Sequence, residues 1–156
     1  MKRRAVYAGS FDPFTVGHSH IVEKALLVFD ELIIAVGINI HKSGFMSVQE
    51  RVEAISEQYI DIPAVKVTSY NGLTTDFCKE SDAKFIVRGV RDIDDFMYER
   101  RNANVNATLA PDIETVLFFS AAEYGDISSS AVREILVHKG DISKFVPETI
   151  LKYIKK

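Results

Sequence analysis

The sequence predicts a single-domain α/β protein with a doubly wound, five-stranded parallel sheet. Short apolar runs rich in β-branched residues alternate along the chain with segments of helical periodicity. A length of 156 residues with 47% hydrophobic content suits one buried core and is too short for two ordinary domains. Residues 1–156 contain no internal repeat, low-complexity tract or Gly/Ser linker, so we assign them to one domain.

Composition argues against several classes of protein. The formal net charge of -3 is not that of a protein that coats nucleic acid, and any anionic ligand must be met by locally placed cations. The apolar stretches are strand-sized and Met1 to Arg4 precedes no cleavage pattern, so we expect a cytoplasmic protein without membrane insertion or export. The single cysteine, Cys78, is expected to be a small buried hydrophobe on a helix rather than a reactive thiol.

Five runs have the length and composition of strands. They cover Ala5 to Ala8, Leu32 to Ile38, Val65 to Thr68, Phe85 to Val87 and Thr115 to Phe119. Strands that alternate with helices are joined by right-handed crossovers and run parallel. Ligands of such sheets bind beyond the carboxyl ends of the strands, and the loops at those ends are therefore the ones to inspect.

Helices are expected between the strands. The first covers about Gly17 to Phe29 and carries an apolar stripe at helical spacing. The second begins with a capping box of Ser47 and Glu50, and Pro63 limits its length. The remaining ones cover about Thr74 to Ser81, Ile93 to Leu109, Ser129 to His138 with Gly140 as its end, and a last helix with Pro147 in its first turn.

The loop from Gly9 to His18 follows the first strand and is neither a GxGxxG turn nor a P-loop. A dehydrogenase or P-loop ATPase is therefore not expected. Gly9 and Gly17 allow close approach of a ligand to the backbone, while His18 falls in the first helical turn, where free amides favour a phosphate. The alternative is that Gly and Pro only turn the chain and that His18 makes a local cap.

Two further loops at strand ends contain residues suited to anions. Arg88 and Arg91 flank Gly89-Val90 directly after the fourth strand, and arginines can fork onto phosphate oxygens. The alternative is that they are solvated or paired with Asp92, Asp94 and Asp95. In the stretch from Tyr124 to Ser130, three consecutive serines open a helix that needs only one of them as a cap. Three such loops at one sheet edge favour a phosphate-rich ligand.

These residues carry a resemblance that covers nearly the whole chain. Thr15-Val16-Gly17-His18 is similar to the Thr/His-x-Gly-His signature of the nucleotidyltransferase superfamily, and Ile127-Ser128-Ser129-Ser130 resembles its second signature. Arg88-Gly89-Val90-Arg91, followed by Asp95-Phe96-Met97-Tyr98-Glu99 and combined with the compact size, resembles the narrower family of phosphopantetheine adenylyltransferases.

The resemblance implies a Rossmann-like nucleotidyltransferase fold and transfer of AMP from ATP to 4'-phosphopantetheine, which gives dephospho-coenzyme A and pyrophosphate. It also implies Mg²⁺ as cofactor without a metal site made of protein ligands alone, a homohexamer, and coenzyme A as feedback inhibitor. The alternatives are adenylyl or cytidylyl transfer to another phosphorylated small molecule, such as nicotinamide mononucleotide, and a non-catalytic nucleotide-binding module.

The resemblance also implies roles for single residues. His18, Lys42 and Arg91 would be catalytic. The acceptor 4'-phosphopantetheine would be bound by Ser10, Lys42, Thr74 and Arg88. ATP would be bound by Ser10, Phe11, His18, Gly89, Val90, Arg91, Glu99, Tyr124, Gly125, Asp126, Ile127, Ser128, Ser129 and Ser130.

Three positions depart from the usual pattern of the family. Ser10 stands where threonine is common, and its hydroxyl group is kept. His20 replaces a residue that is often acidic, and we expect it to be solvated. The proline often found after Asn39 is missing, so Lys42 is placed mainly by its register with Phe45 and with the capping box of the second helix.

Overall fold

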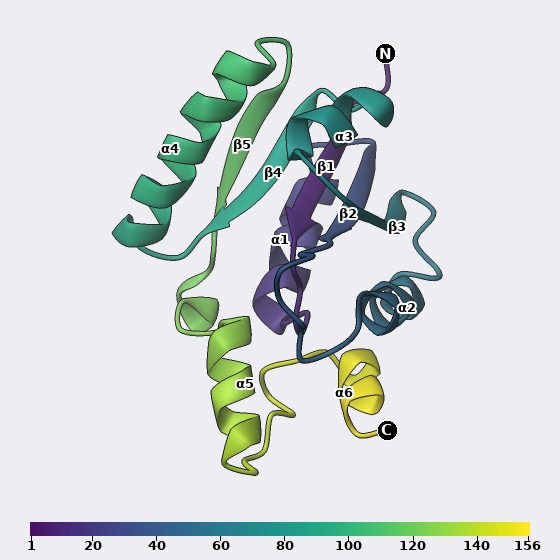
Figure 1. The fold of residues 1–156 in the computed structure, drawn as a ribbon, viewed down its shortest axis with the longest axis vertical. Helices are drawn as coiled ribbons and strands as arrows, with labels where there is room; N and C mark the ends of the chain where they lie inside the picture. Colours follow the sequence, from purple (N-terminus) through teal and green to yellow (C-terminus); the bar gives the residue numbers. More distant parts are fainter.

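A computed structural model describes all residues, 1–156, and confirms the predicted α/β fold with one five-stranded parallel sheet (Figure 1). The strand order is β3-β2-β1-β4-β5, so the chain winds outward in both directions from β1. The strands are β1 (Arg4–Gly9), β2 (Glu31–Gly37), β3 (Val65–Tyr70), β4 (Phe85–Val90) and β5 (Glu114–Phe119).

Six α-helices and one short 3-10 helix accompany the sheet. They are α1 (Val16–Leu26), α2 (Val48–Gln58), α3 (Thr74–Glu80), α4 (Ile93–Leu109), η1 (Ala122–Tyr124), α5 (Ser129–Val137) and α6 (Glu148–Ile154). None of them has the length and apolar character that a membrane-crossing helix requires.

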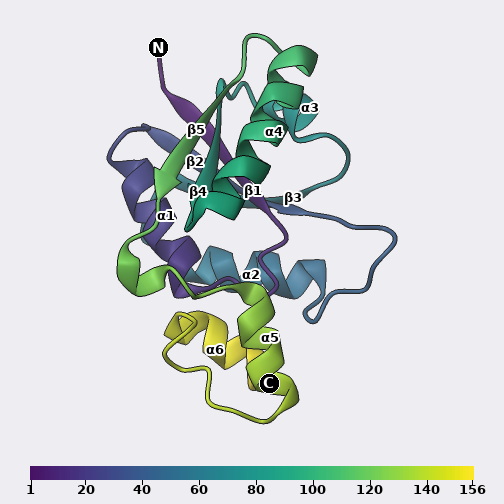
Figure 2. The ribbon, with the colours of Figure 1, turned by 90° about the vertical axis from the view of Figure 1, so that its left-hand side faces the viewer.

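Helices lie on both sides of the sheet (Figure 2), and each face of the sheet has its own hydrophobic core. The larger core joins Ile34 and other sheet residues to Val22 of α1 and Ile55 of α2. The smaller core places Val6 and Ile86 against the α3 and α4 side of the molecule, where Cys78 is buried as predicted. Successive residues of a strand point to opposite faces, which explains why the central strands are apolar throughout.

The carboxyl ends of the strands face α5 and α6, which lie beyond one edge of the sheet (Figure 1). The amide of Val16 at the start of α1 donates to the carbonyl of Phe145 at 2.9 Å, which ties this C-terminal segment to the first loop. Val132 of α5 and Ile150 of α6 are fully buried in the larger core. The loops at the carboxyl edge therefore lie between the sheet and a second layer of helices.

Several element boundaries differ from the sequence prediction. Strand β4 continues through Arg88 and Gly89 to Val90, so these residues extend the sheet instead of forming a turn after it. Helix α1 ends at Leu26, three residues before the predicted end. Pro147 is the N-cap of α6 and not part of its first turn.

The end of α5 also differs from the expectation. Lys139, not Gly140, adopts the left-handed conformation, with φ of 58°. Gly140 is needed for another reason: its amide donates to the carbonyl of Ile135 at 2.8 Å, and a Cβ there would lie only 2.5 Å from the Ile135 side chain.

The amino edge of the sheet is held by a buried carboxylate. Glu31 begins β2 and is 3% exposed. It accepts a hydrogen bond from Lys2 at 2.8 Å and another from Arg4, and it lies 3.3 Å from Lys66 of β3. The Lys2 bond, aided by Arg4 and Lys66, outweighs burial and lowers the pKa of Glu31 to about 2. One side chain thus ties together the starts of three neighbouring strands.

We predict that Glu31→Gln lowers the free energy of unfolding by about 2 kcal/mol at pH 7, because charge-assisted hydrogen bonds are lost. The pKa is depressed in the folded state, so this contribution is complete above the unfolded value near 4.5 and falls as the pH approaches 2. The difference in free energy of unfolding between the two proteins, measured by urea denaturation, should therefore be smaller at pH 3 than at pH 7. Equal differences at both pH values would contradict the proposed charge interaction.

Candidate active site

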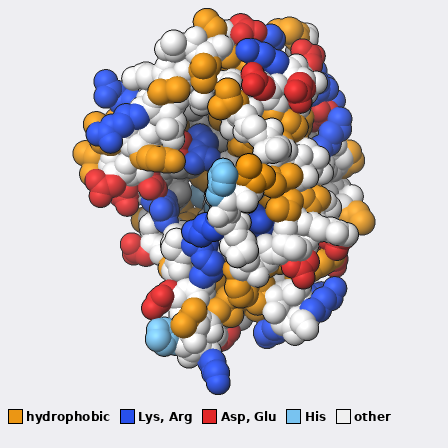
Figure 3. Space-filling view, viewed as in Figure 1, with side chains coloured by type: hydrophobic (Ala, Val, Ile, Leu, Met, Phe, Trp, Pro, Cys, Tyr) orange, Lys and Arg blue, Asp and Glu red, His pale blue; other side chains and the backbone are white.

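A cavity of about 290 Å³ opens at the carboxyl edge of the sheet. The space-filling view shows a hollow in this face, with basic and acidic side chains beside it (Figure 3). The three segments singled out from the sequence all contribute to its lining. The predicted site residues that line it are Ser10, Phe11, His18, Arg88, Gly89, Arg91, Glu99, Tyr124, Ile127, Ser128 and Ser129.

Other predicted residues lie elsewhere. Thr74 lines two adjoining cavities of about 250 and 270 Å³, and Arg88 lines both of these and the main cavity. Lys42 lies in the connection between β2 and α2, outside the linings of all three cavities. Among the remaining residues predicted to bind ATP, the lining does not include Val90, Gly125, Asp126 or Ser130.

The first signature forms a capping box at the start of α1. The hydroxyl of Thr15 accepts from the amide of His18 at 3.3 Å, and the amide of Thr15 donates to Nδ1 of His18 at 2.9 Å. A backbone amide is always a donor, so Nδ1 must be unprotonated and the neutral ring carries its proton on Nε2. The sequence left two alternatives for His18, a local cap and a donor to a ligand. The structure combines them, because Nδ1 takes part in the cap and Nε2–H remains as a donor.

The His18 ring is neutral over the physiological pH range. Burial, aided by the charges of Arg88 and Arg91, lowers its pKa to about 3. The ring packs edge-on against Phe11 with centroids 5.0 Å apart and lies beside Phe14 at 5.3 Å. An aromatic cage thus fixes its orientation, and His18 can act as a hydrogen-bond donor without carrying a charge.

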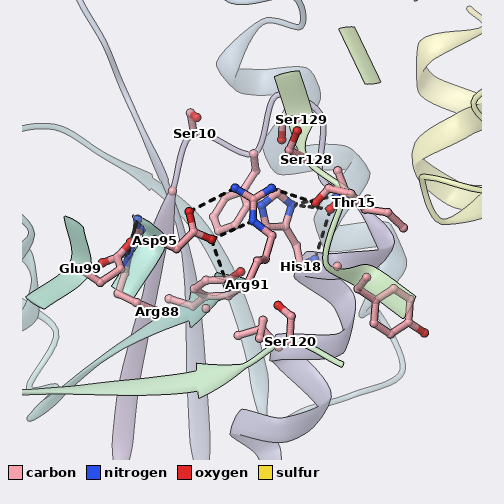
Figure 4. A pocket seen from close by; sticks show the side chains of 18 of the residues that line it. Ser10, Thr15, His18, Arg88, Arg91, Asp95, Glu99, Ser120, Ser128 and Ser129 are labelled. Atoms are coloured by element: carbon pink, nitrogen blue, oxygen red, sulfur yellow. Dashed lines mark hydrogen bonds and ion pairs between the residues drawn. The ribbon is translucent and has the colours of Figure 1, made fainter. Parts of the chain in front are cut away.

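Arg88 projects from β4 and is held by Glu99 of α4. Its Nε donates to the Glu99 carboxylate at 2.9 Å and its Nη2 at 2.7 Å, and Nη1 donates to the carbonyl of Ala8. Burial opposes the charge of Arg88, but the bonds to Glu99 and its negative charge raise the pKa of the guanidinium overall. Glu99 is 5% exposed, so this pair forms a rigid wall of the cavity (Figure 4).

Arg91 is paired with Asp95, which the sequence analysis did not propose as a site residue. Its Nε donates to Asp95 at 2.9 Å, and Nη1 reaches the carbonyl of Ile127 at 3.3 Å (Figure 4). Arg91 stands just before Asp92, the N-cap of α4, and Asp95 follows four residues later in the first turn of the helix. The sequence indicated Asp95 only as a possible partner of the arginines. The structure shows this pairing, and it shows that Asp95 also lines the cavity.

The charged residues of the main cavity balance one another, since Arg88 and Arg91 face Glu99 and Asp95. Unpaired donors are supplied by the start of α5. Ser128 caps this helix by accepting from the amide of Ala131 at 3.1 Å, and the first amides of a helix have no acceptor within it. An anion that enters is therefore met by amides and by the remaining guanidinium protons.

Each of the other two serines has a partner within the chain. Ser129 donates from its hydroxyl to the carbonyl of Pro13 at 2.8 Å, and Ser130 accepts from Arg133 at 3.2 Å. Ser129 thus holds α5 against the first loop, whereas the bond of Ser130 lies within α5 itself.

Gly89 has a different role from the one predicted. It lies in a strand, and a Cβ there would approach Cγ1 of Ile21 to 3.0 Å. The missing side chain lets α1 pack closely on β4 and brings His18 toward the arginines. The position is therefore required by packing, not by a turn.

The chain contains no group of three or more His, Cys, Asp or Glu side chains that could hold a metal ion together. Both carboxylates of the main cavity are already bonded to arginines. A divalent cation at this site would have to be held chiefly by ligand phosphates, which is the usual way in which Mg²⁺ enters nucleotide sites.

Comparisons with known proteins find relatives that match nearly the whole chain. The sequence profile of the cytidylyltransferase-like family matches residues 6–135. A phosphopantetheine adenylyltransferase from Bacteroides thetaiotaomicron is 47% identical over 94% of this chain and 96% of its own length. Another from Staphylococcus carnosus is 45% identical over 98% of this chain and 95% of its own length.

The fold also resembles a solved structure. A protein from Vibrio parahaemolyticus, assigned as a nicotinate-nucleotide adenylyltransferase, superimposes with a TM-score of 0.72 over 99% of this chain and 93% of its own. Its sequence is 16% identical, so this likeness concerns the fold alone.

We predict that His18 remains neutral with its proton on Nε2 between pH 8 and pH 5. Long-range ¹H–¹⁵N spectra of the imidazole nitrogens distinguish the two tautomers and the charged ring. The chain unfolded in urea serves as control, because the pKa of His18 should return there to its ordinary value near 6.5. A folded protein in which His18 titrates near 6.5, or carries its proton on Nδ1, would contradict the geometry of the capping box.

Proposed function

Because this chain belongs to the cytidylyltransferase-like proteins and, among them, to the phosphopantetheine adenylyltransferases, we propose that it transfers the adenylyl group of ATP to 4'-phosphopantetheine. The products are dephospho-coenzyme A and pyrophosphate. The observation that carries this proposal is the convergence of His18, Arg88 and Ser129, from three distant segments, on one cavity. A phosphate-rich ligand fits such a site, because each segment brings donors to the same space.

The acceptor is proposed to span the main cavity and the cavities that adjoin it at Arg88. Its phosphate would lie near Arg88 and Ser10. Lys42 would reach this phosphate from the connection between β2 and α2. Its pantetheine arm would follow the cavity lined by Thr74 of α3 and by Asn102 and other residues of α4. Side-chain amides suit this arm because it contains amide groups that need hydrogen-bond partners.

ATP is proposed to lie on the other side of the main cavity. Its phosphates would meet the free amides at the start of α5 together with Arg91. The segment from Tyr124 to Ser130 and the neighbourhoods of Phe11, Gly89 and Glu99 would surround the rest of the nucleotide. This arrangement requires Arg91 to share its guanidinium protons between Asp95 and a phosphate.

The chemistry needs alignment more than activation. A phosphate monoester is already an anionic nucleophile at neutral pH and needs little help from a general base. One of its oxygens attacks the α-phosphorus of ATP, the bond to the β-phosphate oxygen breaks, and pyrophosphate leaves with the electron pair. Nε2–H of His18 would donate to an α-phosphate oxygen as charge accumulates there. Loss of one donor of this type typically costs about 10²- to 10³-fold in rate.

His18 is unsuited to act as a nucleophile itself. The lone pair of Nδ1 is engaged by the amide of Thr15, and Nε2 carries the proton. We therefore propose a single in-line displacement without a covalent enzyme intermediate.

Magnesium is proposed to enter with ATP, bound by its phosphates. It would neutralise phosphate charge when bound, which complements a cavity whose own charged residues cancel. Asp95 is the more exposed of the two carboxylates and would be the side chain available to its water ligands.

Assembly, location and regulation are also proposed. Helix α4 buries only Glu99 and leaves Ile93, Val105 and Leu109 exposed, which supports association between subunits. The number of subunits comes from the family resemblance alone: we propose a homohexamer, which light scattering would detect at six times the 17.5 kDa chain mass. We place the reaction in the cytoplasm. Coenzyme A has both the pantetheine arm and the adenosine part of the product, so it would compete for the same cavities as a feedback inhibitor.

We predict that pyrophosphate release requires ATP and 4'-phosphopantetheine together. The assay crosses ATP or CTP with three acceptors: 4'-phosphopantetheine, nicotinamide mononucleotide and a phosphorylated small alcohol such as glycerol 3-phosphate. The expected result is a rate with ATP and 4'-phosphopantetheine at least about 100-fold above every other pair, since Asn102 and Asn106 offer hydrogen-bond partners to the amide groups of the pantetheine arm. Release that proceeds with another acceptor but not with 4'-phosphopantetheine would overturn the proposal.

A further inference from the structure

A buried ion pair lies behind the first signature and takes no part in the chemistry described above. Asp12 is 7% exposed and Arg51 is 6% exposed, and neither lines the main cavity. Nε of Arg51 is 4.0 Å from Oδ1 of Asp12, so the two charges attract one another without a short direct hydrogen bond. Their hydrogen bonds go instead to the backbone of two separate segments.

Asp12 holds the connection that carries Lys42. Its Oδ2 accepts from the amide of Phe45 at 2.7 Å, and its Oδ1 accepts from the amide of Met46 at 2.8 Å. Hydrogen bonds from backbone amides to a carboxylate are among the stronger ones in proteins. They fix the chain three residues after Lys42, directly before α2 begins at Val48.

Arg51 makes the reciprocal connection from the first turn of α2. Its Nη1 donates to the carbonyl of Ser10 at 2.6 Å, and its Nε donates to the carbonyl of Met46 at 3.1 Å. A planar guanidinium can bridge two such acceptors, whereas an ammonium group is a single point charge. Arg51 thus joins the Ser10 backbone to the same short stretch of chain that Asp12 holds.

Close packing around this pair supports a specific arrangement. A Cβ on Gly44 would lie 2.9 Å from Oδ2 of Asp12 and 3.1 Å from Nη2 of Arg51. A third contact comes from α5, where Nη1 of Arg133 donates to the carbonyl of Asp12 at 2.8 Å. The pair is therefore enclosed by the segments that surround the cavity.

We propose that Asp12 and Arg51 are positioning residues that set the distance between Ser10 and Lys42, and so place the acceptor phosphate for attack. The inference rests on the proposed function, in which Ser10 and Lys42 hold the acceptor phosphate. Fold stability alone does not account for the pair, because a buried ion pair can often be replaced by apolar side chains without loss of stability. The backbone targets of this pair are the two segments that meet the acceptor, and a misplacement of about 1 Å can cost about 100-fold in rate.

The first test is Arg51→Met, which keeps an unbranched side chain but removes the guanidinium and with it both bridging bonds. We expect kcat/KM for 4'-phosphopantetheine to fall by about 10- to 100-fold, while the dissociation constant for ATP, measured by calorimetry, changes by less than about threefold. Arg51→Lys should lose less, because its ammonium can satisfy one of the two carbonyls. This variant also keeps the test valid if Arg51→Met does not fold.

Glu31→Gln is the matched control for a merely structural role. It removes a buried charge network at the opposite edge of the sheet, so it should reduce stability and leave kcat/KM for the acceptor unchanged. A loss of stability in the Arg51 variants with unchanged kcat/KM for the acceptor would overturn the inference. So would equal losses in ATP binding and in acceptor use.

A double-mutant cycle tests the link to Lys42 directly. If Arg51 acts by placing Lys42, Arg51→Met should cost little more in a Lys42→Ala background, and the two effects should be strongly non-additive. Additive effects would show that Arg51 acts on something else. Failure of the proposed function would be seen separately, as absence of pyrophosphate release from ATP and 4'-phosphopantetheine by the unmodified protein.

Discussion

All five strands run parallel, and this constraint brings their carboxyl ends, with the loops that follow them, to one edge of the sheet. Residues as far apart in sequence as Ser10, Arg88 and Ser129 meet there only because of this topology. The amino ends of α1 and α5 lie at the same edge, and the first amides of α5, which have no acceptor within the helix, add donors that need no charged side chain. The site is therefore a property of the sheet direction as much as of individual residues.

Local hydrogen bonds then turn this convergence into a defined geometry. The capping box of Thr15 fixes both the orientation and the tautomer of His18. The arginines are held in place by Glu99 and Asp95 before any ligand enters. Such pairing reduces the positive charge of the cavity, and it also removes the cost of ordering long side chains when the substrates bind. Preorganisation, not an excess of cations, thus accounts for the suitability of this cavity for two anions.

The sequence allowed the fold class, the strand positions and the three loops to be predicted, because these depend on periodicity and on residues close in the chain. Strand β4 was predicted too short because Arg88 and Gly89 look unlike strand residues, although the arginine is neutralised by Glu99 and the glycine admits Ile21. The buried ion pair of Asp12 and Arg51 could not be predicted, because the two residues are 39 positions apart and their hydrogen bonds go to backbone groups. The placement of Lys42 outside the cavity linings also depends on tertiary structure alone.

The central claim is that this cavity aligns two anions for one direct displacement and offers no nucleophile of its own. The most direct measurement is the stereochemical course at phosphorus, with ATP made chiral by sulfur at the α-position and 4'-phosphopantetheine as acceptor. A single in-line displacement inverts the configuration of the transferred thiophosphoryl group, and the account predicts inversion in the dephospho-coenzyme A analogue that forms. Retention would require two successive displacements through a covalent enzyme intermediate and would contradict it.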